Sequence, residues 1–449
     1  MDTLQVPDLE AGEVTARPIW TGGRKSAFGW ALYDWANSPF TTVVTTFIFA
    51  AYFAGAIAPD KTTGASQWAF TQGAAAFVMA ILSPILGAIA DHGKGRKAWI
   101  VFWTLVMVAA SAALWWGAPG VDSTVLVLTA AFIGVIGFEM GLVFYNAMLP
   151  GLAPASHIGR LSGWSWGLGY IGGLACLVLL LFVFVQPQVA PFGLDKSAAE
   201  HIRIAGPVVA VWALVFSLPL FFLTADTPGA GLPMGRAVGA GLRTLGNTLA
   251  NVRKHANIAR FLIARIFYVD GLNTIFAVGA IYAATVFGMG TAEVLIFGII
   301  VNVTAGLGAF AFAWLDDRLG AKSTVLLGVA GVTVCGIPML FVDDKTWFYV
   351  LGGIMGLFFG PAQAASRSLM SHLAPRGQEA EMFGLYAFAG KCTAFLGPWI
   401  FGAVTLAAGP RWGMATVVPF LVIGAVILLK VDTGKVDTGK VAPEESVPE

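Results

Sequence analysis

Charged residues are scarce in this chain, and their scarcity excludes most classes of soluble protein. Asp, Glu, Lys and Arg make up 11% of the 449 residues, whereas hydrophobic residues make up 57%. Soluble domains carry about 25% charged residues, because their surfaces face water. The formal net charge of +1 also excludes a broad basic surface of the kind that binds nucleic acid.

Cysteines, histidines and catalytic motifs are sparse as well. Cys176, Cys335 and Cys392 lie inside apolar runs without metal-ligand spacing, so we expect no disulfide, metal site or cofactor. The five histidines lie in loops or at the ends of apolar runs, and the sequence contains neither HExxH nor a phosphate-binding glycine loop. These absences predict that the chain is not an enzyme. A membrane-embedded enzyme remains the least favoured alternative.

What the chain does have is a series of long apolar runs. Runs of about 18 residues suffice to cross a hydrocarbon core of about 30 Å. Twelve such runs predict an all-α membrane protein with twelve transmembrane helices, in contact with the lipid bilayer. They cover residues 27–58, 68–90, 98–117, 124–149, 161–185, 205–224, 257–287, 292–315, 323–341, 346–371, 381–404 and 412–430.

The distribution of Lys and Arg predicts the orientation of these helices. With the N-terminus inside, eighteen Lys and Arg fall on the cytoplasmic side, and only Lys61, Lys196, Arg203, Lys345 and Arg411 fall on the other. This bias follows the positive-inside rule. We therefore expect a multi-pass protein of a bacterial-type inner membrane, with both termini in the cytoplasm.

The longest polar stretch, residues 225–256, separates two sets of six runs that resemble each other. The first run contains DWANSPF and the seventh DGLNTIF; GAIADHGKGRK precedes the third run and DDRLGAKS the ninth; Leu-Ala-Pro follows the fourth and the tenth. Three matches in the same order predict a duplicated six-helix unit, a repeat found in transporters. The predicted segments are an N-terminal cytoplasmic segment (1–26), a six-helix bundle (27–224), a cytoplasmic linker (225–256), a second bundle (257–430) and a disordered cytoplasmic tail (431–449).

The two matched loops resemble the signature loop of the major facilitator superfamily. The opening ALYDWANSPFTTVVTTFIFAAYF resembles one branch of it, the vacuolar amino-acid effluxer-like (autophagy-related permease-like) family. The resemblance implies the major facilitator fold, with two pseudo-symmetric six-helix bundles. It also implies conformational latches at the two loops, formed by Gly87, Asp91, Arg96 and Lys97 and by Asp317, Arg318, Gly320 and Lys322. For Arg96 and Lys97, simple anchoring at a capped turn is the alternative role.

Six ionisable side chains lie inside the apolar runs: Asp34, Glu139, Arg265, Asp270, Arg367 and Lys391. Each costs about 2.5–3.5 kcal/mol at a helix centre, so we expect three acids and three bases to neutralise one another. The resemblance implies that the first, fourth, seventh and tenth helices line a central cavity, and five of the six charges lie on those helices.

We therefore predict a cavity for the substrate and the coupling ion, lined by these six side chains and by polar neighbours. Pro39 cannot donate a backbone hydrogen bond, so it frees the carbonyl of Trp35 beside Asp34. For each polar neighbour taken singly, helix–helix contact is the alternative role. The neighbours are Asn37, Tyr145, Asn146, Asn273 and Gln363.

Together these features predict a secondary active transporter that works by alternating access. We expect it to move a small polar solute, an amino acid or similar, with efflux as the direction and protons as the candidate coupling ion. We expect a monomer whose partner is a small-molecule substrate, without a nucleic-acid partner. A non-transporting membrane sensor or scaffold on the same fold remains open.

Overall fold

The computed structural model describes residues 23–120 and 122–433, and this part of the chain is helical without a strand. The predicted N-terminal segment and tail lie largely outside the described residues. Eleven of the described helices are long and apolar enough to cross a membrane, and a twelfth span is broken in two. Apart from α1 and α17, which cover only part of their predicted runs, the main helices of these eleven spans begin and end close to the predicted runs. They are α1 (Gly23–Pro39), α3 (Lys61–His92), α4 (Lys97–Ala113), α5 (Thr124–Leu152), α6 (Ile158–Leu180), α8 (Ala205–Leu223), α10 (Ala256–Phe287), α11 (Thr291–Leu319), α12 (Ala321–Met339), α13 (Lys345–Leu373) and α17 (Val417–Leu429).

The first span changes its winding at Pro39. After α1 the chain continues as π-helix over Phe40–Phe47, as the short α2 (Phe49–Tyr52) and again as π-helix over Phe53–Ile57. A proline removes one helical hydrogen bond, and π-turns often mark functional places in a helix. The Trp35 carbonyl that Pro39 frees accepts a bond from Trp212 Nε1 at 3.2 Å. This carbonyl is therefore satisfied by helix packing.

The eleventh span is interrupted, although a continuous run over 381–404 was predicted. It consists of α14 (Glu379–Ala389) and α15 (Leu396–Ala408), with turns between them. Pro398 explains part of the interruption, because it has no N–H to donate to the carbonyl of Ala394 four residues earlier. The last span follows as α16 (Pro410–Ala415) and α17.

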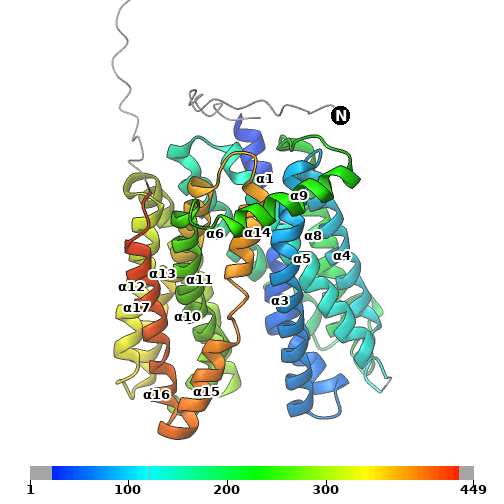
Figure 1. The fold of residues 1–449 in the computed structure, drawn as a ribbon. Helices are drawn as coiled ribbons and strands as arrows, with labels where there is room; N and C mark the ends of the chain where they lie inside the picture. The colour runs from blue at the N-terminus through cyan, green and yellow to red at the C-terminus, as the bar shows by residue number, and fades with distance from the viewer. Residues whose placement is uncertain (1–22, 121, 434–449) are drawn as a thin grey trace, which may run out of the picture.

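Two six-helix bundles stand side by side (Figure 1). They meet through α3 and α14, through α6 with α11 and α13, and through α5 and α14. The contacts are tight: Ser83 Oγ donates to the Gly384 carbonyl at 3.0 Å, and Ser162 Oγ donates to the Ala364 carbonyl at 2.7 Å. A Cβ on Gly87 would collide with the Ala380 carbonyl oxygen. These contacts lie toward one end of the bundles, the end that carries the linker, which we call the linker face.

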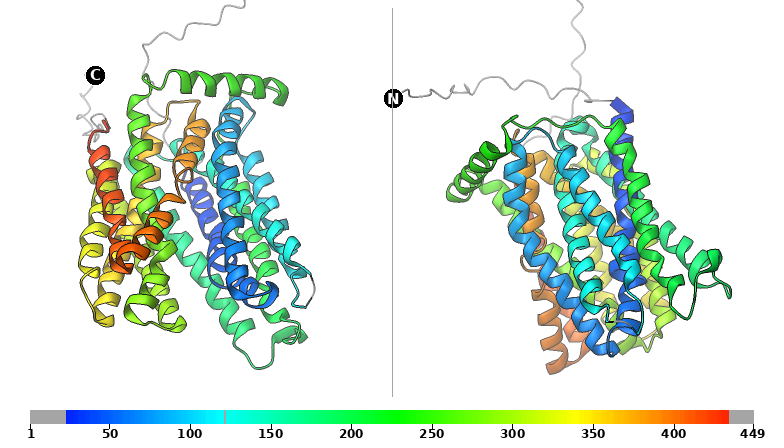
Figure 2. Two further views of the ribbon diagram at one scale, coloured as in Figure 1. Left: turned by 60° about the horizontal axis from the view of Figure 1, so that its bottom comes forward. Right: turned by 90° about the vertical axis from the view of Figure 1, so that its right-hand side faces the viewer.

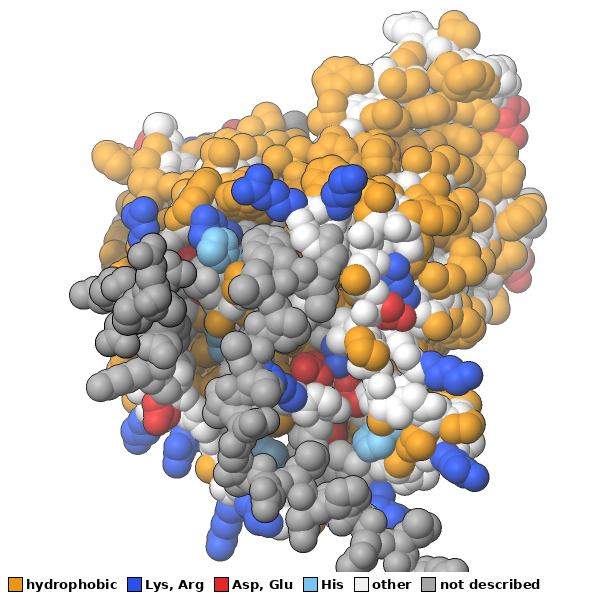
Figure 3. All heavy atoms as spheres, turned by 90° about the horizontal axis from the view of Figure 1, so that it is seen from above, with side chains coloured by type: hydrophobic (Ala, Val, Ile, Leu, Met, Phe, Trp, Pro, Cys, Tyr) orange, Lys and Arg blue, Asp and Glu red, His pale blue; other side chains and the backbone are white. Residues whose placement is uncertain are grey.

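The linker between the bundles contains a helix, α9 (Met234–Ala250). It crosses the linker face and packs on α3 (Figures 1 and 2). The chain just before it follows the end of α3, since the amides of Ala230 and Gly231 donate to the carbonyls of Asp91 and Gly93. Lys and Arg side chains are spread over this face, and hydrophobic side chains lie along its upper and right-hand rim in the view of Figure 3.

Acidic residues cap two helices at the opposite end, which we call the open face. Asp60 accepts bonds from the amides of Thr62 and Thr63 at 2.9 Å each and starts α3. Asp344 starts α13 in the same way, with bonds from Thr346 and Trp347. The Thr63 hydroxyl and amide hold the pKa of Asp60 below its usual value. These caps satisfy amides that a helix leaves without partners at its first turn.

Candidate functional site

A cavity of about 1040 Å³ lies between the bundles. It extends from Asp34 and Asn146 in the middle of the spans to Leu340, where α12 ends at the open face. On α3 only Gln72 lines it, because the linker-face part of α3 is packed on α14. The cavity is therefore accessible from the open face and closed toward the linker face.

Most of the predicted site residues line this cavity. They are Asp34, Asn37, Glu139, Asn146, Arg265, Asn273, Gln363 and Lys391. Tyr145, Asp270 and Arg367 lie outside its lining. The sequence analysis missed aromatic lining residues such as Trp166 and Tyr386, because an aromatic residue in an apolar run carries no signal that separates a cavity wall from a core.

Arg367 is completely buried below the cavity and joins the bundles. From α13 it reaches across to α1, α5 and α6, and it forms an ion pair with Asp34 at 3.0 Å. Its other partners are Asn146 Oδ1 at 3.2 Å, Ser162 Oγ at 2.9 Å, the Ser162 carbonyl at 2.6 Å and Ser165 Oγ at 2.6 Å. These bonds occupy all five N–H donors that a guanidinium has. In this conformation Arg367 has no donor left for a substrate.

Aromatic rings surround the same guanidinium. Its Cζ lies 4.9 Å from the ring centroid of Trp166 and 5.1 Å from that of Trp30. Trp30 stacks on Tyr145 at 4.3 Å and donates to the Tyr145 carbonyl at 2.9 Å. Tyr145 is thus a packing partner of the Arg367 site. Cation–π contacts of this kind strengthen when the cation is desolvated.

A second ion pair crosses the cavity. Lys391, in the break of the eleventh span, donates to Glu139 of α5 at 2.6 Å. The Lys391 side chain is 31% exposed and the Glu139 side chain is 19% exposed. Because the pair is open to the cavity and joins opposite bundles, it can exchange partners with a solute or separate when the bundles move.

Arg265 is the cavity cation that has no carboxylate partner among the described residues. Its Cζ lies 3.6 Å from the ring centroid of Tyr386. Its Nε and Nη1 are buried and have no hydrogen-bond partner within the described chain. A buried guanidinium with unmet donors is costly. It therefore offers a binding place for an anionic group.

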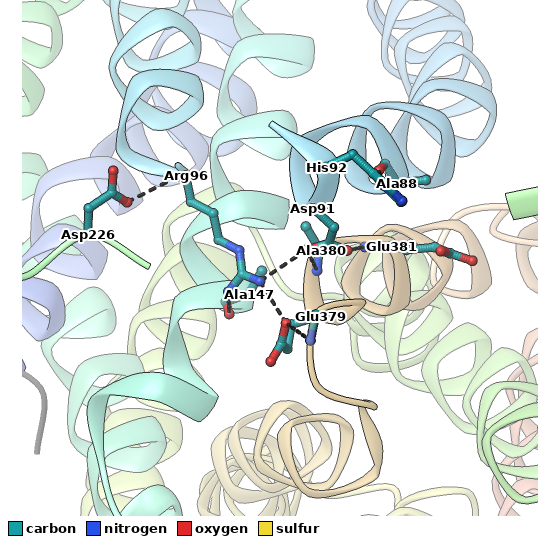
Figure 4. Close-up of polar contacts among 10 residues, drawn as sticks. Ala88, Asp91, His92, Arg96, Ala147, Asp226, Glu379, Ala380 and Glu381 are labelled. Atoms are coloured by element: carbon teal, nitrogen blue, oxygen red, sulfur yellow. Dashed lines mark hydrogen bonds and ion pairs between the residues drawn. The ribbon is translucent and has the colours of Figure 1, made fainter. Parts of the chain in front are cut away.

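Two of the predicted latch residues of the first loop, Asp91 and Arg96, lie together at the linker face (Figure 4). The Asp91 carboxylate accepts bonds from the amides of Ala380 and Glu381 at 3.0 and 2.8 Å, so it caps α14 of the opposite bundle. Arg96 forms ion pairs with Asp91 at 3.0 Å and with Glu379 at 2.8 Å. A carboxylate at a helix N-terminus gains from both the amides and the helix dipole.

Asp226 and the backbone carbonyl of Ala147 complete this cluster. Asp226 accepts bonds from the amides of Arg96 and Lys97 at 3.0 and 3.1 Å and starts α4. Arg96 also donates to the Ala147 carbonyl. Sequence reasoning missed Glu379 and Asp226, since both lie outside the predicted apolar runs and far from Arg96 in sequence.

The second loop repeats the arrangement. Asp317 at the end of α11 accepts from the Arg160 amide at 3.2 Å and pairs with Arg160 Nε at 2.5 Å, at the start of α6. Lys322 donates to the carbonyls of Leu429 and Val431 and so closes the end of α17. Gly320 adopts a φ of 86° in the turn between α11 and α12, and Arg318 is exposed. Asp91 and Asp317 therefore each tie their own bundle to the other one.

The comparison with known proteins agrees with this architecture. Residues 52–440 match the family described as Vacuole effluxer Atg22 like. An uncharacterized transporter of the major facilitator type from Bacillus subtilis, YxiO, is 28% identical over 414 residues, covering 90% of this chain and 94% of that protein. Autophagy-related protein 22-1 of Penicillium rubens is 27% identical over 301 residues, which is 61% of this chain and 50% of the fungal protein. The chain thus spans about half the length of that fungal relative.

Solved structures show the same fold at low sequence identity. The human organic anion transporter MFSD10 superposes with a TM-score of 0.70 at 12% identity, covering 90% of this chain and 99% of that one. FucP, the E. coli fucose:proton symporter, superposes in its outward conformation with a TM-score of 0.70 at 14% identity, covering 91% and 98%. With its duplicated bundles, its matched loops and a family match over most of its length, this chain belongs to the Atg22-like vacuole effluxer family of major facilitator membrane transporters.

Proposed function

We propose that this transporter moves a small solute that carries a carboxylate, such as an amino acid, by alternating access, and that Arg265 binds the carboxylate. The observation that supports the proposal most directly is the Arg265 guanidinium in the wall of a cavity that opens at one end, because two of its nitrogens have no hydrogen-bond partner among the described residues. A guanidinium binds a carboxylate through two parallel N–H donors, which gives both strength and orientation.

The same cavity has groups suited to the rest of an amino acid. Asp34 and Glu139 line it beside the amides of Asn37 and Asn273. Both acids already pair with a cation, but Glu139 and its partner Lys391 are partly exposed to the cavity. An ammonium group can therefore replace Lys391 at Glu139 while the carboxylate binds Arg265.

The contacts between the bundles support the proposal of alternating access. In the conformation described here, the linker face is held closed by the contacts of Arg367, Asp91 and Arg96 and by the Asp317–Arg160 pair. The opposite conformation requires these ties to break and the open face to close. We propose that the linker face is cytoplasmic, as the positive-inside rule predicts, and that transport runs outward from the cytoplasm.

The test is uptake and counterflow in proteoliposomes with a panel of radiolabelled amino acids, with and without a pH gradient. Arg265→Gln is expected to lower the uptake of any transported amino acid at least about tenfold, since a lost charge-assisted bidentate contact is worth about 1.5–3 kcal/mol. Arg260→Gln, an exposed position on the same helix, is the matched control and should transport normally.

Two outcomes would contradict the proposal. Equal uptake by Arg265→Gln and the wild-type protein would exclude Arg265 as the carboxylate site. Saturable binding of an amino acid without any flux would favour the sensor alternative, in which the fold is kept and transport is not.

A further inference from the structure

Asp270 of α10 is the one acid among the six predicted span charges that has neither an ion-pair partner nor a hydrogen-bond partner among the described residues. Asp270 is 2% exposed, and neither of its carboxylate oxygens has a hydrogen-bond partner among the described residues. No described cation lies within ion-pair distance of it. The Gly397 amide approaches the carboxylate without reaching hydrogen-bond geometry. An ionised carboxylate buried in this way costs several kcal/mol, so the site requires a neutralising cation.

The repeat explains why no counter-charge is present. Asp34 and Asp270 occupy matching positions in the DWAN and DGLN segments. Asp34 is neutralised by Arg367, which lies six residues before the Leu-Ala-Pro of the second bundle. The position six residues before the matching Leu-Ala-Pro of the first bundle is Asn146. Asn146 carries no charge, so the repeat does not supply Asp270 with a cation.

The helix break lies where it can act on this acid. Gly169 of the unbroken α6 packs on Asp34 and lies fifteen residues after the first Leu-Ala-Pro. The residue fifteen positions after the second Leu-Ala-Pro is Gly390, which follows the last residue of α14. After the break, α15 starts beside the backbone of Asp270, since a Cβ on Gly397 would lie 3.4 Å from the Asp270 carbonyl oxygen. A broken helix exposes free amides and carbonyls, which transporters use to bind ions.

The groups that face Asp270 are few. Cys392, in the break, is the titratable side chain that interacts electrostatically with it, and Cys392 also interacts with Arg265. Tyr386 of α14 is occupied by its contact with Arg265. From α17, the apolar Phe420 and Leu421 pack on the neighbouring Gly271.

We propose that Asp270 is a proton-binding site: its carboxyl group is protonated in this conformation and releases the proton to cavity water when the eleventh span rearranges. This role deepens the proposed transport function, because one proton would then move in each cycle. Proton binding at Asp270 can nevertheless be measured without any substrate, so it can fail or hold independently of amino-acid transport.

The experiment is infrared difference spectroscopy of the full chain in lipid, titrated with H⁺ in water and in D₂O. The wild-type protein is expected to show the C=O stretch of a buried carboxylic acid, and Asp270→Asn is expected to lack it. Asp34→Asn, Glu139→Gln and the exposed Asp122→Asn should all keep it. Because asparagine resembles the neutral acid in shape, Asp270→Asn should elute and melt like the wild-type protein, which excludes misfolding as the reason for the loss.

Three results would overturn the proposal. The band could persist in Asp270→Asn, so that another acid holds the proton. The wild-type protein could lack the band altogether, so that Asp270 is ionised. The band could disappear when Na⁺ replaces K⁺ at constant pH, so that the site binds sodium in place of a proton.

Discussion

At the scale of single residues, the six charges of the spans have three different fates. Asp34 and Arg367 form a buried pair, Glu139 and Lys391 form a pair at the cavity wall, and Arg265 and Asp270 remain without an ionic partner among the described residues. Equal numbers of acids and bases on neighbouring helices therefore do not imply complete pairing. The unpaired members are the ones to which we assign ligands.

The Arg367 network permits a prediction about stability. Arg367→Gln leaves Asp34 buried without its counter-charge, and breaking one side of such a pair costs about 3–5 kcal/mol. The single variant is therefore expected to melt well below the wild-type protein in detergent. Asp34→Asn with Arg367→Gln removes both charges and should recover part of the loss. Equal melting temperatures for the single and double variants would mean that the pair is not coupled.

At the scale of elements, the closure of the linker face depends on α3 and α14. Gly87 and Gly384 allow the two helices to approach until backbone atoms touch, and Asp91 then reaches the first amides of α14. Small residues at such crossings are typical of helix packing in membranes. The two helices are this close only when the linker face is closed. A larger side chain at Gly87 or Gly384 is therefore expected to destabilise that conformation selectively.

Gly87→Ala is expected to open the linker face, because its Cβ would collide with the backbone carbonyl of Ala380. The measurement is the reactivity of a cysteine at the adjacent buried Ser83, in a background in which the three native cysteines are replaced by alanine. Its modification rate should rise several-fold with Gly87→Ala. Gly73→Ala, on the same helix in open space, should leave the rate unchanged; a rise with both variants would point to general loosening of α3.

At the scale of the whole molecule, the cavity is accessible from one face only. The bundles touch through α3, α5 and α6 against α11, α13 and α14 toward the linker face. Toward the open face, the π-helical segment Phe40–Phe47 and the ends of α10 and α12 line the cavity. The molecule thus has the asymmetry that a single state of an alternating-access cycle requires.

Accessibility in intact cells is a test of that asymmetry and of the orientation. In the cysteine-free background, Thr46→Cys, which is exposed in the cavity wall, should react with a membrane-impermeant maleimide added outside. Lys94→Cys, exposed at the linker face, should react only in inside-out vesicles. The reverse pattern would place the linker face outside the cell.

The sequence alone was sufficient for much of this description. The apolar runs predicted the spans, since a bilayer demands about 20 apolar residues for each helix. The matched segments predicted the two bundles and the family. The same comparison of repeats pairs Asp34 with Asp270 before any coordinate is known.

Only the tertiary structure decided which of these groups have partners. Arg367 looked like a substrate ligand by position, but its five donors are used by four side-chain oxygens and one backbone carbonyl from three other helices. Arg265 and Asp270, five residues apart on one helix, face different surroundings, one the cavity and the other the break at α15. The interruption of the eleventh span was hidden as well, because hydropathy measures how apolar a segment is and not whether its backbone stays helical. Pairing, exposure and helix breaks depend on what neighbouring helices bring to within a few ångströms, and that distance is set by packing across the two bundles.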